Sequence, residues 1–122
     1  MITKIDLRET LEIPVLETSS AIEQFQNQSL RPVLKLQNEL YLKLFSTYCA
    51  RQNPDFNSLS AAKKRTFIEQ SLLKDSVLKN TFIGITIGML TLSELDLYIL
   101  ESKEYNRRMI TMLTERIKDQ TK

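Results

Sequence analysis

Apolar residues along most of the chain recur every three or four positions, the spacing that places them on one face of an α-helix. Beyond about residue 20, this spacing predicts about five helices, at 21–28, 30–51, 61–74, 76–90 and 92–119. The chain has only two glycines and three prolines, fewer turn residues than a sheet of several strands needs. We therefore predict an all-α fold, in which residues 20–122 form a single-domain bundle with a long C-terminal helix.

The expected helix starts carry residues whose side chains accept hydrogen bonds from the first helical turn. Ser20 and Thr91 are each followed three residues later by a glutamate, which is the spacing of a capping box. Pro32 falls in the first turn of its predicted helix, where a missing N–H group costs no hydrogen bond. The other predicted caps are Ser29, Ser58 or Ser60, and Asp75 or Ser76.

The helix predicted at 76–90 has apolar residues on two sides and small residues on the third. The small side includes Gly84 and Gly88, and each glycine costs about 1 kcal/mol of helix propensity relative to alanine. Close approach of a neighbouring helix would offset that cost, so we expect this helix at the centre of the bundle. A phosphate-binding glycine loop is not favoured, because no strand precedes the glycines and no Lys-Ser/Thr pair follows.

Uncharged polar residues interrupt the apolar faces of the two most amphipathic predicted helices. Gln37 lies in one of these faces, and Ser102 and Asn106 lie in that of the last helix. Antiparallel packing of the two helices would bring them into one buried, hydrogen-bonded cluster. Such a cluster would either fix helix register or subunit pairing, or orient a small ligand in a pocket between helices.

The first 19 residues are predicted to form an extended N-terminal arm. Leu11, Ile13 and Val15 alternate with polar or proline residues, a pattern that favours extended backbone. The start of the last helix is apolar nearly all round, because Leu97 and Leu100 lie on its otherwise polar side. We expect the arm and this helix start to form an interface, covered by the same chain or by a second subunit.

Histidine is absent and cysteine occurs once, at Cys49. These counts exclude zinc sites built from cysteine and histidine, two-histidine iron sites, and Ser-His or Cys-His nucleophile pairs. We expect no metal, no cofactor and no catalytic residue, and we expect Cys49 to be a buried, reduced thiol. The longest uncharged stretch, 80–93, is too short to span a bilayer, and the N-terminus lacks a signal-peptide pattern, so a cytoplasmic location is expected.

Charge is nearly balanced, with 17 basic and 15 acidic residues and a formal net charge of +2. Arg107 and Arg108 follow Glu104 at the spacing of surface ion pairs on a helix. As an alternative, Arg31 and Arg116 would converge with Arg107 or Arg108 on an anion.

Three segments resemble a family of small, uncharacterised all-helical bacterial proteins: residues 25–40 (FQNQSLRPVLKLQNEL), 80–88 (NTFIGITIG) and 104–108 (EYNRR). The resemblance covers about residues 20–120. It implies that four groups of residues belong together: Arg31-Pro32, Gln37-Asn38, the glycine pair and Asn106-Arg107-Arg108. Some members of the family are labelled glyoxalase, but true glyoxalases bind a metal through histidine and glutamate on a βαβββ scaffold. A chain without histidine takes no catalytic residue from that label.

These patterns favour a protein that acts through association without catalysis, as a homodimer or as a protein-interaction module. The alternative is a small-molecule or anion-binding protein, with enzyme activity left open and a site between the second and last predicted helices. The candidate residues of that site are Arg31, Gln37, Ser102, Asn106, Arg107 and Arg108. Neither a membrane nor nucleic acid is an expected partner, because the basic run at 63–65 is typical of a solvated helix end.

Overall fold

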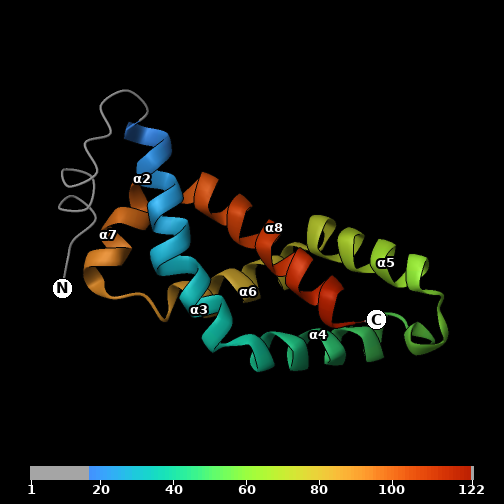
Figure 1. Cartoon of the computed structure of the whole chain (residues 1–122). Helices are drawn as coiled ribbons and strands as arrows, with labels where there is room; N and C mark the ends of the chain where they lie inside the picture. Colours follow the sequence, from blue (N-terminus) through green and yellow to red (C-terminus); the bar gives the residue numbers. More distant parts are fainter. Residues whose placement is uncertain (1–16, 122) are drawn as a thin grey trace.

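The computed structural model describes residues 17–121, and their side chains from residue 21 onward. Every regular element in this range is helical, which confirms the all-α prediction (Figure 1). Residues 1–16 of the predicted arm, including Leu11, Ile13 and Val15, lie outside the described residues, and its last three residues, 17–19, belong to a helix rather than to an extended segment. The elements are α2 (Glu17–Phe25), the π-helical turn η1 (Gln26–Leu30), α3 (Arg31–Leu36), α4 (Asn38–Gln52), the 3-10 turn η2 (Phe56–Ser58), α5 (Ala61–Lys74), α6 (Ser76–Ile87), α7 (Leu92–Leu100) and α8 (Ser102–Gln120).

Helix α8 carries the apolar stripe on which the other elements pack. Its residues Tyr105, Met109, Leu113 and Ile117 recur every four positions and are all buried. Helix α8 contacts η1, α5, α6 and α7, and Figure 1 shows it running through the middle of the described helices. The hydrophobic core therefore forms around α8, with partners that include Phe25, Leu34, Tyr41, Ile68, Leu72 and Phe82.

The prediction that the helix at 76–90 is central, with glycines that allow close packing, is wrong. Helix α6 buries one face, formed by Leu78, Phe82 and Thr86. A Cβ added at Gly84 would meet no atom of another element within 4 Å. A Cβ at Gly88 would come within 3.2 Å only of the carbonyl oxygen of Gly84 itself. The glycine side of α6, with Val77, is exposed because α8 occupies the centre of the bundle.

The predicted boundaries of α5 and the start of α6 are confirmed by their caps. The Oγ of Ser60 accepts a hydrogen bond from the backbone N–H of Lys63 at 3.3 Å. The Oδ1 of Asp75 accepts one from the backbone N–H of Leu78 at 3.0 Å. Both caps satisfy N–H groups that the helices themselves leave without partners.

Residues 17–36 form one helical run, so the two predicted starts within it are wrong. Helix α2 begins at Glu17, which places Ser20 inside the helix, and Ser29 is buried within η1. The regular helix is interrupted later, at Gln37, where φ is −97° and ψ is 16°. These residues stay helical because Phe25, Leu30 and Leu34 must all reach the core.

The long helix predicted over 92–119 is two helices. The capping box at its start is confirmed, with hydrogen bonds of 2.9 and 3.1 Å between Thr91 and Glu94. The chain then turns at Glu101, where φ is −139° and ψ is 42°. This turn folds α7 back so that the Tyr98 hydroxyl donates a hydrogen bond to Oδ1 of Asn106 on α8. The turn also buries the Tyr98 side chain, which would not pack against α8 if the two helices were one straight helix.

We predict that Leu113→Ala lowers the free energy of unfolding by about 2–5 kcal/mol, because it leaves a cavity in the centre of the core. The matched control is Leu73→Ala, because Leu73 is a helical leucine that is exposed. That substitution should change stability by no more than about 0.5 kcal/mol. Urea denaturation followed by circular dichroism measures both, and equal losses would contradict the central position of α8.

Candidate functional site

Helix α8 points in the same direction as the run from α2 to α3, and hydrogen bonds connect it to Gln26 in η1 and to Asn38, the first residue of α4. At one end, Nη1 of Arg108 donates to Oε1 of Gln26 at 2.8 Å. At the other end, Nδ2 of Asn38 donates to Oε1 of Gln120 at 2.7 Å, and Nη2 of Arg116 donates to Oδ1 of Asn38 at 3.3 Å. Because residue 26 meets 108 and residue 38 meets 116 and 120, the two segments are parallel (Figure 1).

A groove of about 990 Å³ lies between these two segments. Its volume is that of a small-molecule site. Apolar side chains contribute to its wall, from Pro32, Leu34 and Met112. Two acidic side chains also line it, Glu115 and Asp119. Its most abundant charged residues are basic: Arg31, Lys35, Arg107, Arg108 and Arg116. Five basic and two acidic residues leave an excess of three positive charges on the lining.

Three of these basic residues have no acidic partner in the described part of the chain. Among the residues that the structure describes, Arg31, Lys35 and Arg116 form no ion pair. The Nε of Arg116 is moreover buried without an acceptor from that part of the chain. A buried donor without a partner is costly, and a bound anion satisfies such a group.

The π-helical turn η1 positions the wall opposite α8. The backbone N–H of Arg31 donates to the carbonyl oxygen of Gln26, five residues earlier, which widens the turn by one residue. This wider turn comes directly before Pro32, whose ring in a regular helix would clash with the carbonyl four residues back. It places Gln26, Asn27 and Arg31 together on the groove, and Nε of Arg31 donates to Oδ1 of Asn27 at 2.8 Å.

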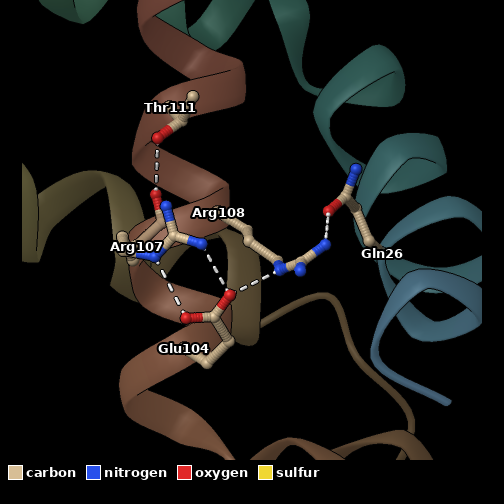
Figure 2. A network of polar contacts seen from close by, with 5 residues as sticks. All are labelled: Gln26, Glu104, Arg107, Arg108 and Thr111. Atoms are coloured by element: carbon tan, nitrogen blue, oxygen red, sulfur yellow. Dashed lines mark hydrogen bonds and ion pairs between the residues drawn. The ribbon is translucent and has the colours of Figure 1, made fainter. Parts of the chain in front are cut away.

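Glu104 holds the two neighbouring arginines of α8 (Figure 2). Arg107 donates from Nε to Oε1 at 3.0 Å and from Nη2 to Oε2 at 2.6 Å. Arg108 donates from Nε to the same Oε2 at 2.7 Å. Hydrogen bonds from Arg107 and then Arg108 lower the pKa of the Glu104 carboxyl to about 2, so this group stays ionised at neutral pH.

Comparisons with protein-family models, with curated proteins and with solved structures find no match for this chain. The resemblance to a family of small helical bacterial proteins therefore stays a prediction. No residue role is taken from it.

The structure brings together some of the predicted ligand-binding residues and separates others. Arg31, Arg107 and Arg108 all line the groove, together with Arg116. The remaining candidates do not line it: Gln37, Ser102 and Asn106. The polar lining residues that were not among the predicted ones include Gln26, Asn27 and Lys35.

The predicted cluster of Gln37 with Asn106 does not form, because the two helices are parallel rather than antiparallel. Asn106 bonds to Tyr98 near the start of α8. Gln37 precedes Asn38, which bonds to Gln120 at the end of α8. At 1.5 Å per residue, about 21 Å of helix separates Asn106 from Gln120.

The predicted interface residues also have different surroundings. Leu100 is 76% exposed, whereas Leu97 is partly buried and packs against the core. Leu92 and Ile99, which are 81% and 61% exposed, join Leu100 on α7. We refer to Leu92, Ile99 and Leu100 as the α7 patch.

Cys49 is a buried free thiol, as predicted, and burial raises its pKa to about 11. Within residues 17–121, no three histidine, cysteine, aspartate or glutamate side chains gather as a metal site. In the same part of the chain, no helix has the length and apolar character needed to cross a bilayer.

We predict that the Glu104 carboxyl titrates near pH 2 in the folded protein, as followed by carboxyl-carbon NMR. Replacing both arginines, in Arg107→Gln/Arg108→Gln, should return the midpoint toward 4.5, the ordinary value. Because the folded pKa is lowered, the stabilisation from this carboxylate is present above about pH 4.5 and is lost as pH falls toward 2. A wild-type midpoint near 4.5 would contradict the ion pairs with Arg107 and Arg108.

Proposed function

We propose that the groove between α3 and α8 binds a small organic anion that carries phosphate or carboxylate groups. The observation behind this proposal is the excess of basic side chains around one groove, three of which have no acidic partner in the described chain. Cations kept together repel one another, and a ligand with negative charge relieves that repulsion.

The other lining residues suit the organic part of such a ligand. Pro32 and Met112 offer apolar surface within the groove. Gln26 and Asn27 use their carbonyl oxygens to accept from arginine, which leaves their amide N–H groups for a ligand. A mostly preformed pocket with apolar contacts and a few polar groups is the usual construction of a small-molecule site.

We predict that millimolar pyrophosphate or citrate raises the melting temperature of the protein at low ionic strength. Salt at about 0.5 M should weaken the effect, because it shortens the Debye length to about 4 Å and so screens the attraction between the anion and the groove. Lys35→Glu should reduce the shift, because Lys35 lines the groove and forms no ion pair within residues 17–121. Lys63→Glu is the matched control, since it makes the same charge change on α5 outside the groove. Comparing the two anions distinguishes phosphate from carboxylate ligands.

Absence of any melting-temperature shift with either anion would overturn this proposal. So would an equal loss of the shift in Lys35→Glu and Lys63→Glu, since that result would indicate general charge effects.

A second proposal is that the α7 patch is the surface through which two copies of the chain associate. Leu92 and Ile99 are two helical turns apart and lie on one side of α7, with Leu100 beside them. Large apolar side chains gathered on one exposed helix are typical of protein interaction surfaces. Leu11, Ile13 and Val15, expected to share this interface, are outside the described residues.

We predict that light scattering of the full chain gives twice its mass of 14.2 kDa. Ile99→Lys/Leu100→Lys should give the monomer mass, because burying two charges in an apolar interface is costly. Val77→Lys, at an exposed valine on α6, is the control and should leave the mass doubled. A wild-type monomer at high concentration would rule out this second proposal.

A further inference from the structure

We propose that Arg31 and Arg108, one on each wall of the groove, jointly bind a single phosphate group of the ligand. Asn27, Gln26 and Glu104 act as positioning residues that hold the two guanidinium groups. This inference rests on the proposed function of the groove and specifies where in it the anion binds.

Arg31 is oriented without being neutralised. Its Nε donates to the carbonyl oxygen of Asn27 at 2.8 Å, and an amide carries no charge. Both terminal nitrogens, Nη1 and Nη2, have no acceptor among the residues that the structure describes. Arg31 therefore presents its charged end with its direction fixed.

Arg108 is held in a similar way on the opposite wall (Figure 2). Its Nε donates to Glu104 at 2.7 Å and its Nη1 donates to Gln26 at 2.8 Å. The remaining nitrogen, Nη2, has no acceptor in the described part of the chain. Gln26 directly precedes Asn27, so adjacent residues of η1 orient both arginines toward the same groove.

Arg107 has a different arrangement, although it is the neighbour of Arg108. Two of its nitrogens bind both oxygens of Glu104, which occupies one whole edge of its guanidinium. Its side chain is 64% exposed, against 26% for Arg108. Arg107 and Arg108 share the single negative charge of Glu104, which leaves an excess of one positive charge on the two arginines. Arg108 contacts Glu104 through Nε alone, whereas Arg107 uses a whole edge.

A phosphate group fits two arginines on opposite walls better than a carboxylate does. A phosphate monoester offers three terminal oxygens in a tetrahedral arrangement, so separate oxygens can accept from each arginine. A carboxylate has two oxygens in one plane, which match a single guanidinium edge. The structure thus favours a phosphate monoester whose organic part lies over Pro32 and Met112.

The test is calorimetric titration of the full chain with phenyl phosphate, and with benzoate for comparison. Arg31→Lys and Arg108→Lys keep the charge but remove the oriented guanidinium, and each should weaken phenyl phosphate binding about tenfold to a hundredfold. Arg51→Lys, at an exposed arginine of α4 outside the groove, is the matched control and should change the affinity by less than about threefold. Benzoate should bind at least about tenfold more weakly than phenyl phosphate.

Glu104→Gln tests whether Glu104 positions Arg108, because the two possible roles of Glu104 change the affinity for phenyl phosphate in opposite directions. Loss of a negative charge beside the groove would by itself strengthen anion binding. If Glu104 positions Arg108, Glu104→Gln instead weakens phenyl phosphate binding. In the wild type, phenyl phosphate should shift the side-chain NMR signals of Arg31 and Arg108, and leave those of Arg107 nearly unchanged. Urea denaturation of each variant confirms that it is folded.

Two results would overturn this inference while leaving the proposed function intact. In the first, Lys35→Glu weakens phenyl phosphate binding, but Arg31→Lys and Arg108→Lys change it no more than the control Arg51→Lys does. The other is equal affinity for benzoate and phenyl phosphate. Tighter binding by Glu104→Gln would overturn the positioning role of Glu104. If the wild type binds none of phenyl phosphate, citrate and pyrophosphate, both this inference and the proposal that the groove binds an anion are overturned.

Discussion

The burial of one stripe of α8 determines both the core and the groove. The buried stripe of α8 consists of Tyr105, Met109, Leu113 and Ile117. Each residue that directly precedes a member of this stripe points about 100° away from it around the helix axis. That direction contains Arg108, Met112 and Arg116, all of which line the groove. The register that buries the apolar residues therefore places the basic residues in a row beside them.

The opposite wall depends on a local departure from α-helical geometry. Leu30 and Leu34 are buried on the core side of the first helical run. The π turn at 26–30 accommodates the proline that follows and shifts the register of the residues before it. Gln26, five residues before Arg31, thereby reaches the groove alongside it. A regular helix would place residues five apart about 140° from each other.

The features that follow from short-range chemistry were predictable from the sequence. The caps at Ser60, Asp75 and Thr91 each need only a side chain and a backbone N–H three residues away. The all-α fold follows from the apolar spacing over the whole chain. The grouping of Arg31 with Arg107 and Arg108 was also anticipated as the alternative to surface ion pairs.

What the sequence did not indicate depends on contacts between distant segments. The turn at Glu101 exists because Tyr98 reaches α8, and the exposure of Gly84 follows from the central position of α8. Helix direction is likewise a property of the whole bundle, so the separation of Gln37 from Asn106 could not be read from either helix alone. Gln26 was missed because α-helical periodicity misplaces residues in a π turn.

The way Arg31 is held differs from the pairing of charges in a stabilising surface network. Stabilising pairs bring opposite charges together, as Glu104 does with the edge of Arg107. Arg31 is instead held by a neutral amide through Nε, which fixes its direction but does not offset its charge. Folding gains little from an uncompensated cation, so the stability of the chain does not explain this arrangement. The proposed anion would account for it, because it would meet donors whose orientation is already fixed.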